Sequence, residues 1–220
     1  MTNTSCFNAV LFDLDGTLLD TLEDLANSTN AVLERHGLPV HPLASYKYFV
    51  GDGVENLARR ALPQDLLDDA LLAACVTAIR EEYGRRWHER THPYAGIAEL
   101  LDTLTARGVS MAVFSNKPDQ FTQLTVQYFL PHWRFDAVRG ARAGKPKKPD
   151  PAVALEIAAE LAVPPREFLY LGDTNTDMAT AIGAGMYPLG ALWGFRPADE
   201  LLESGAKALL AQPLDLLQYL

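Results

Sequence analysis

Short apolar runs that end in polar residues recur along this chain, and they constrain its fold more than any other feature. The runs are Phe7–Leu14, Val109–Phe114, Phe135–Val138, Phe168–Leu171 and Tyr187–Leu192. Runs of this length are typical of parallel strands that are buried on both faces. Patterns with apolar residues on one helical face occupy the intervals, at Ile97–Ala106, Ala152–Leu161 and Asp177–Ala184. The alternation predicts an α/β fold, in which right-handed crossovers place helices on both faces of a parallel sheet.

The segment from about Asp20 to Arg90 breaks this alternation, because it lacks convincing strands. An amphipathic helix that contains Leu22 and Leu33 stops at Gly37, and a longer helix spans roughly Gln64–Glu89. We therefore predict two domains, an α/β core from residues 1–18 and 92–220 and an all-helical insertion from residues 19–91. Residues 206–211 are predicted as an edge strand of the core.

Size and charge narrow the class of protein. The chain has 220 residues, a formal net charge of −9 and a pI near 5.0. A negative surface argues against nucleic acid or an anionic membrane as the main partner. A bound cation and a few basic side chains can still create a pocket for a small anion.

Cysteine usage and the N-terminal sequence bear on the compartment. Cys6 and Cys75 lie far apart among apolar residues, so we interpret them as small buried side chains rather than as a disulfide framework. The apolar stretch at residues 9–12 is too short for a signal peptide or a membrane span. A cytoplasmic protein is expected.

Polar clusters follow three of the predicted strands. In parallel sheets, ligands bind outside the carboxyl ends of the strands. Asp13 and Asp15 leave the first strand and precede Gly16, which permits a tight turn. One such carboxylate can serve as a nucleophile and the other as a general acid and base. A polar turn without catalytic function is the alternative interpretation of this cluster.

The other clusters supply ligands and positive charge. Asp173 and Asp177 lie in a loop that opens a helix, where carboxylate oxygens suit Mg²⁺. Helix capping by Asp173 or Thr174 is the alternative role for this cluster. The sequence Ser115-Asn116-Lys117 offers a hydroxyl and backbone N–H groups to a phosphate oxygen. A basic loop contains Lys145, Lys147 and Lys148, one of which could stabilise a transferring phosphoryl group.

These four clusters, in this order, resemble the motifs of the haloacid dehalogenase-like (HAD) superfamily over nearly the whole chain. The resemblance implies a Rossmann-like core with an inserted alpha-helical cap. It implies that Asp13 forms an aspartyl phosphate, and that Asp15 protonates the leaving oxygen and then activates water. It further implies that Ser115 and Lys148 hold phosphoryl oxygens. Lys148 is preferred because Lys148-Pro149-Asp150-Pro151 resembles the family's Lys-Pro-x-Pro, although Lys145 and Lys147 offer competing registers.

The resemblance also implies a metal site and a substrate. The Asp13 carboxylate, the Asp15 backbone carbonyl and Asp173 would hold Mg²⁺, with Asp177 supporting them. The segments Phe49–Val54, Arg59–Leu62 and Tyr94–Ile97 are similar to phosphoglycolate phosphatase-type members. This similarity implies a phosphatase that acts on a small phosphorylated metabolite, 2-phosphoglycolate above others, as a monomer or homodimer. Substrate-binding positions are expected at Thr17, Asn116, Gly51 and Arg60.

Several other activities share these motifs. A sugar-phosphate mutase, a pyrophosphatase and a nucleotidase remain open as alternatives. A dehalogenase is disfavoured because Asp15 is present, and a phosphonatase is disfavoured because only Lys47 offers a candidate for Schiff-base chemistry. A non-catalytic binding module is disfavoured because all four aspartates are retained.

Overall fold

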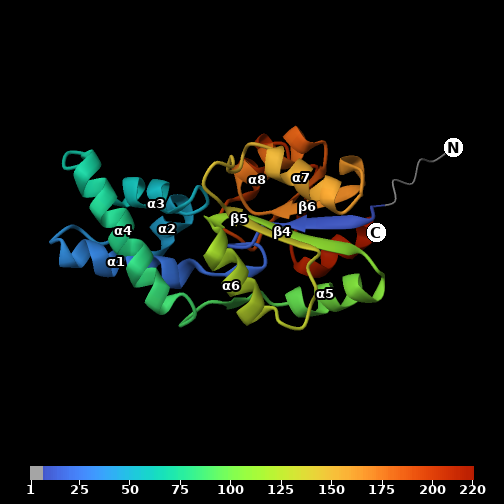
Figure 1. The fold of residues 1–220 in the computed structure, drawn as a ribbon, viewed down its shortest axis with the longest axis horizontal. Coiled ribbons are helices and arrows are strands. Elements are labelled where there is room, and N and C mark those ends of the chain that lie inside the picture. The colour runs from blue at the N-terminus through green and yellow to red at the C-terminus, as the bar shows by residue number, and fades with distance from the viewer. Residues whose placement is uncertain (1–6) are drawn as a thin grey trace. The chain divides into compact units, whose positions relative to one another are not determined.

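The computed structural model describes residues 7–220, and its centre is a six-stranded parallel sheet (Figure 1). The strand order is β5-β4-β1-β6-β7-β8. The strands are β1 (Ala9–Phe12), β4 (Ser110–Pro118), β5 (Ala137–Ala141), β6 (Phe168–Gly172), β7 (Tyr187–Ala191) and β8 (Ala208–Leu210). The predicted α/β fold with a parallel sheet is confirmed.

Helices cover both faces of this sheet, as its largely apolar and buried strands require. The helices α5 (Ile97–Ala106) and α6 (Asp119–Phe129) lie on one face, and α7 (Ala152–Glu160) and α8 (Asn175–Ala184) lie on the other (Figure 1). Shorter elements near the C-terminus are α9 (Ala198–Glu203) and the 3₁₀ turn η2 (Pro213–Tyr219), and a second 3₁₀ turn, η1 (Pro165–Glu167), precedes β6. All four residues of β1 are buried, so the strand that carries the first acidic cluster lies in the middle of the core.

Two element boundaries differ from the sequence prediction in ways that matter for the polar clusters. Strand β4 continues through Ser115-Asn116-Lys117 to Pro118, with a register irregularity against β5 between Phe114 and Pro118. These residues were predicted to lie in a loop. Helix α8 begins at Asn175 rather than Asp177, because Thr174 caps it and Asp177 completes the capping box.

The chain separates into two compact units, Leu19–His92 and the remainder. The smaller unit is helical, with α1 (Leu22–Arg35), α2 (Leu43–Phe49), α3 (Val54–Ala61) and α4 (Asp69–Arg86). Two short strands, β2 (Leu19–Asp20) and β3 (His92–Pro93), pair where the chain enters and leaves it. The Asp68 carboxylate caps α4 by accepting from the Leu71 backbone N–H at 2.7 Å.

A buried carboxylate fastens the two ends of the helical unit to each other. Asp24, in the first turns of α1, is 1% exposed. Its oxygens accept hydrogen bonds from the backbone N–H groups of Arg90 and Thr91, at 3.0 and 2.9 Å, and from the Thr91 hydroxyl at 2.7 Å. A buried ion is tolerated when several donors satisfy it in this way.

Asp24→Asn is therefore expected to destabilise the protein by about 2 kcal/mol, because an amide N–H₂ group would face backbone donors that it cannot satisfy. Chemical denaturation measures the change. Glu23→Gln is the matched control, since Glu23 pairs with Arg90 at 3.5 Å with both side chains at least half exposed; we expect that change to have little effect. Equal stability of the two variants would contradict this role for Asp24.

Candidate active site

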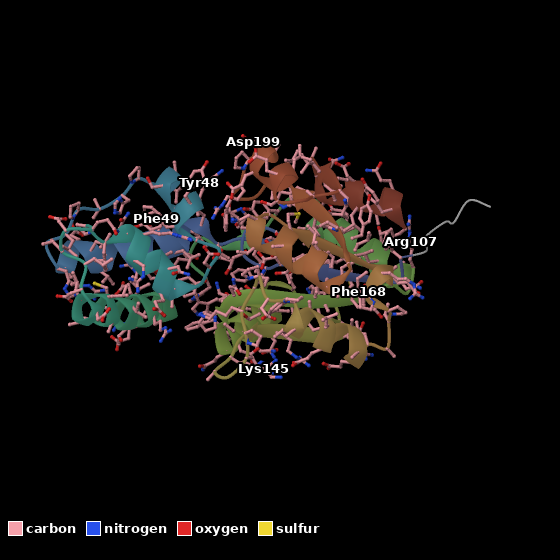
Figure 2. The ribbon with its side chains drawn as sticks, turned by 90° about the horizontal axis from the view of Figure 1, so that it is seen from above. Tyr48, Phe49, Arg107, Lys145, Phe168 and Asp199 are labelled. Carbon is pink, nitrogen blue, oxygen red and sulfur yellow. The ribbon has the colours of Figure 1, made fainter. Side chains whose placement is uncertain are left out.

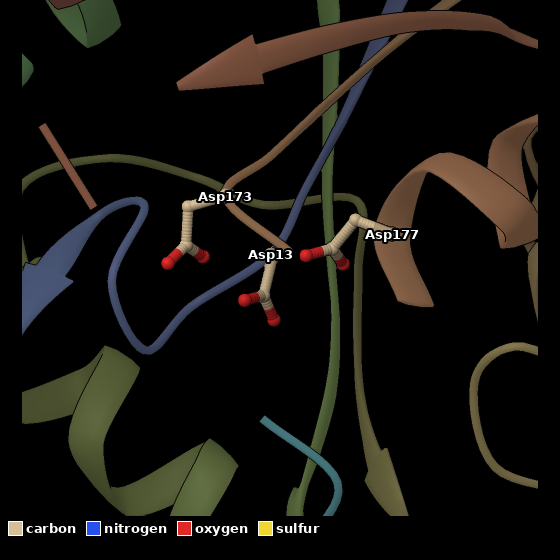
Figure 3. Close-up of side chains that lie close together, drawn as sticks. All are labelled: Asp13, Asp173 and Asp177. Carbon is tan, nitrogen blue, oxygen red and sulfur yellow. The ribbon is translucent and has the colours of Figure 1, made fainter. Parts of the chain in front are cut away.

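Three buried carboxylates converge at the carboxyl ends of β1 and β6 (Figure 3). They belong to Asp13, Asp173 and Asp177, and one oxygen of each lies within 4.8 Å of the others. Asp13 follows β1, which pairs directly with β6, so the pairing of these two central strands brings Asp13 and Asp173 together. Asp177 reaches the same place from the first turn of α8. The two acidic clusters of the sequence thus form one site.

Lys148 joins two of these acids. Its ammonium lies 2.7 Å from Asp13 Oδ1 and 2.7 Å from Asp177 Oδ1, and its side chain is 2% exposed. The Phe114 ring lies 5.6 Å from the same nitrogen. Lys145 and Lys147, the competing candidates, are both exposed, and Lys145 pairs with Glu156 at the surface (Figure 2). Of the three lysines, the structure brings Lys148 into the acidic cluster.

Asn116 holds the backbone of Lys148 in place. The Asn116 carbonyl oxygen accepts from the Lys148 backbone N–H at 2.9 Å, and the Asn116 amide donates to the Lys148 backbone carbonyl at 3.2 Å. Ser115 lies next to it, is 2% exposed, and its hydroxyl oxygen accepts from the Lys117 backbone N–H. Asn116 therefore acts on Lys148 at the site, whereas contact of Ser115 with a phosphate oxygen stays a prediction.

Asp173 is enclosed by groups that orient both of its oxygens. The Thr17 hydroxyl donates to Oδ1 at 3.0 Å, and the Phe195 backbone N–H donates to Oδ2 at 2.8 Å. A Cβ on Gly16, where φ is +91°, would lie 2.3 Å from Asp173 Oδ2, and a Cβ on Gly194 would lie 2.3 Å from its Cβ. Glycine is thus required at both positions if Asp173 is to keep its place.

Asp177 is held equally firmly. Its Oδ2 accepts from the Thr174 backbone N–H at 3.0 Å and from the Thr174 hydroxyl at 2.6 Å. Its other oxygen accepts from Lys148, and the Tyr170 hydroxyl lies 3.4 Å away. Thr174 is therefore the cap of α8, as one of the two alternatives proposed, and Asp177 both completes the capping box and belongs to the acidic cluster.

The electrostatics favour a bound cation. Three buried carboxylates lie together, and one ammonium pairs with two of them. Burial raises the pKa of Asp13 well above its usual range, against the attraction of Lys148 and with a further rise from Asp177 and Asp173. Burial, with a contribution from Asp177, raises the pKa of Asp173 to about 7. Burial opposes the charge on Lys148, but the two carboxylates outweigh it and hold the Lys148 pKa well above its usual range.

An all-oxygen set of buried carboxylates is the donor set that Mg²⁺ prefers, so the residues present fit the metal. Asp13, Asp173 and Asp177 are the side chains that could hold it. The Asp15 carboxylate lies outside this set, because it binds Lys117. The earlier assignment of Asp15 concerned its backbone carbonyl, and it stays a prediction.

These pKa directions predict how Mg²⁺ should stabilise the protein. A carboxyl group whose folded pKa is raised binds more protons when folded, so between about pH 4 and about pH 7 the metal-free protein should lose stability from these groups as pH rises. Mg²⁺ binds the ionised carboxylates, so its stabilising effect should grow across the same window. Thermal unfolding with Mg²⁺ and with chelator, at each pH, measures the difference. A metal effect that is the same at every pH would contradict the assignment.

Three features of the site went unrecognised in the sequence. Lys117 is bound to Asp15, the Phe195 backbone binds Asp173, and the Trp193 indole donates to the Thr17 backbone carbonyl at 2.9 Å. Residues 193–195 follow the predicted strand Tyr187–Leu192 directly. The rule that places ligands at the carboxyl ends of strands could therefore have identified them.

Two predicted substrate positions lie in the helical unit. The Arg60 guanidinium donates to the Phe49 carbonyl at 3.1 Å and to the Tyr48 carbonyl at 3.3 Å, and it pairs with the Asp52 carboxylate. It thereby fastens the loop that contains Gly51, where φ is +120°. Contact of either residue with a substrate stays a prediction.

Comparison with known proteins places this arrangement in a family. The family model described as haloacid dehalogenase-like hydrolase matches residues 10–191, which include all four acids. The chain belongs to the haloacid dehalogenase-like hydrolase family. The resemblance inferred from the motifs is therefore confirmed.

Individual relatives show which members of the family this chain resembles. The chain is 34% identical to a phosphoglycolate phosphatase from Pseudomonas putida, over 86% of this chain and 72% of that protein. It is 32% identical to a phosphoglycolate phosphatase from Nitrosospira multiformis, over 92% and 90% of the two chains. Among solved structures it resembles a predicted phosphoglycolate phosphatase from Haemophilus somnus, with a TM-score of 0.89, 26% identity and 99% coverage of both chains. The chain is thus phosphoglycolate phosphatase-like across nearly its whole length.

Proposed function

We propose that this protein is a Mg²⁺-dependent phosphatase that hydrolyses a small phosphomonoester through a phosphoryl group on Asp13. The observation that supports this most strongly is the arrangement of Asp13. Its carboxylate lies at the end of the central strand, buried, with the Lys148 ammonium on one oxygen and the Asp173 and Asp177 carboxylates beside it. A nucleophile surrounded by fixed charges suits phosphoryl transfer, which depends on positioning and electrostatic stabilisation.

In the proposed first half-reaction, an oxygen of Asp13 forms a bond to the phosphorus of the ester. The bond from phosphorus to the alcohol oxygen breaks, and Asp15 gives its proton to that oxygen. The Lys148 ammonium, and the Ser115 hydroxyl, would bind oxygens of the transferring group. A bound Mg²⁺, held by Asp13, Asp173 and Asp177, would supply positive charge that offsets the charge of the carboxylates and the phosphoryl oxygens.

In the proposed second half-reaction, Asp15 takes a proton from a water molecule. The water oxygen bonds to phosphorus, and the bond between phosphorus and the Asp13 oxygen breaks. Inorganic phosphate leaves, and Asp15 is again protonated for the next turnover. Thr17 and Asn116 would support this cycle through Asp173 and Lys148, with which they form hydrogen bonds. Direct contact of either residue with the substrate stays a prediction.

The substrate that we propose is 2-phosphoglycolate. The similarity to phosphoglycolate phosphatases over most of the chain supports it. Pyrophosphate, nucleotides and sugar phosphates are the competing substrates, because the acid cluster alone does not discriminate among leaving groups. No helix in residues 7–220 is long and apolar enough to cross a membrane. The cytoplasm and a monomer or homodimer remain the expected setting.

Phosphate release from a panel of phosphoesters tests the proposal. The panel holds 2-phosphoglycolate, pyrophosphate, a nucleoside monophosphate and glucose 1-phosphate, each with Mg²⁺ and with chelator. We expect metal-dependent release with 2-phosphoglycolate preferred. Preference for another ester would contradict the assignment of 2-phosphoglycolate as the substrate, but it would remain consistent with the proposed mechanism. Conversion of the sugar phosphate to an isomer without free phosphate would favour the mutase alternative.

A further inference from the structure

Lys117 makes a buried ion pair with the second aspartate of the first motif. Its ammonium lies 2.9 Å from Asp15 Oδ1 and 3.2 Å from Asp15 Oδ2. The Lys117 side chain is 4% exposed and the Asp15 side chain 13% exposed. Both oxygens of Asp15 therefore lie within hydrogen-bonding distance of one nitrogen.

Two different lysines divide the two acids of the motif between them. Lys148 binds Asp13 and Asp177, whereas Lys117 binds Asp15. The Asp15 carboxylate is correspondingly absent from the group of carboxylates that could hold a metal in residues 7–220. A carboxylate that must exchange protons with the substrate and with water has to stay off the metal, and the pair with Lys117 keeps it apart from the cluster.

The backbone places Lys117 for this contact. Strand β4 continues to Pro118, but its register against β5 shifts between Phe114 and Pro118. The Lys117 backbone N–H donates to Ser115 Oγ at 3.2 Å, and its carbonyl accepts from the Thr122 hydroxyl at 3.1 Å. A Cβ on Gly140 of β5 would lie 2.6 Å from that carbonyl oxygen, so the neighbouring strand approaches closely here. Two hydrogen bonds therefore hold the backbone of Lys117 at the irregular end of β4, where β5 packs closely against it.

We propose that Lys117 is a positioning residue for Asp15. It holds the Asp15 carboxyl group so that Oδ1, the oxygen of the shorter contact, keeps the ammonium. Oδ2 then carries the proton that passes to the leaving oxygen of the ester, and later accepts a proton from the attacking water. This inference rests on the proposed function, because it assigns Lys117 a part in the proton transfers of that reaction. The attraction within a buried ion pair offsets the cost of removing both charges from water only when the two groups are well aligned. The same alignment is what holds a catalytic side chain in its working orientation.

The test compares Lys117→Met, Lys117→Gln and Lys117→Arg with the wild type. We expect kcat for 2-phosphoglycolate to fall about 10- to 100-fold in the Met and Gln variants, with KM nearly unchanged, because the transition state alone uses an oriented acid. Lys117→Arg should recover part of the loss, since it restores a positive donor. Lys207→Met is the matched control, because Lys207 is an exposed lysine of the same unit. Thermal unfolding and Mg²⁺ binding are measured on each variant, so that a folding defect is recognised.

Two further readouts separate a positioning role from a structural one. In an Asp15→Asn background, Lys117→Met should cause little additional loss of kcat, because the group that it orients is gone. With 4-nitrophenyl phosphate, whose leaving group needs no proton, Lys117→Met should slow hydrolysis of the phosphoryl enzyme more than its formation. A burst of 4-nitrophenolate should therefore appear in the variant.

The outcomes distinguish this inference from the proposed function. If the losses of kcat caused by Lys117→Met and Asp15→Asn multiplied when the two were combined, the positioning role would be overturned. The same holds if Lys117→Met raised KM and left kcat unchanged. Either result would leave the phosphatase assignment in place. A wild-type protein that releases phosphate from none of the esters would overturn the proposed function and this inference together.

Discussion

Asp13→Asn is expected to abolish phosphate release while the protein still folds. An amide oxygen carries no negative charge and cannot take the place of a carboxylate nucleophile. Loss of a nucleophile removes about four or more orders of magnitude of rate in enzymes that use covalent catalysis. The fold should survive because Asp13 contributes a polar side chain to a site and no apolar packing to the core. Lys148 also keeps its second partner, Asp177.

Phosphate release with 2-phosphoglycolate and Mg²⁺ measures the loss of activity, and thermal unfolding measures whether the variant still folds. Asp65→Asn is the matched control, since Asp65 is an exposed aspartate of the helical unit. It should behave as the wild type in both assays. Turnover by Asp13→Asn within about ten-fold of the wild type would remove Asp13 from the role of nucleophile.

Lys148→Met should have the second largest effect, on both activity and stability. We expect kcat to fall about 100- to 1,000-fold, because the variant lacks the cation that would bind the phosphoryl oxygens. In chelator at about pH 8, unfolding should require about 3 kcal/mol less than for the wild type, since removing one partner leaves buried carboxylates uncompensated. Mg²⁺ should restore part of this stability by binding those carboxylates.

Lys147→Met controls for the loss of a positive charge in the same loop, because Lys147 is exposed next to Lys148. It should leave stability and kcat unchanged. If Lys147→Met lowered kcat and Lys148→Met did not, the competing register of the basic loop would be correct and the geometry of the site would have been misread.

The sequence was sufficient for the parts of the site that depend on strand order. Polar clusters follow three of the predicted strands, and parallel strands bring their carboxyl ends to one edge, so Asp13 and Asp173 meet once β1 pairs with β6. That inference needed only topology and chemical type. The choice of Lys148 came from the resemblance to the family's Lys-Pro-x-Pro, and the structure places Lys148 between Asp13 and Asp177.

The contacts and element bounds that could not be predicted from the sequence depend on local backbone geometry. The pairing of Lys117 with Asp15 arises from the irregular end of β4, and a side-chain direction after a register shift does not follow from residue spacing. The start of α8 at Asn175 depends on a capping box between Thr174 and Asp177, and the sequence predicted Asp177 only as a residue of the metal site. The bounds of α2 and α3 escaped prediction because both helices are short, with seven and eight residues, so neither holds a long periodic pattern.

The central claim is that the phosphoryl group resides on Asp13 during turnover. Acid quenching of the wild type and of Asp15→Asn while each turns over 2-phosphoglycolate with Mg²⁺, followed by mass spectrometry of the digested chain, tests it directly. We expect a phosphoryl group on the peptide that contains Asp13, more of it in Asp15→Asn, and none in Asp13→Asn. A phosphoryl group on any other residue, or turnover with no phosphorylated chain in either protein, would contradict the account.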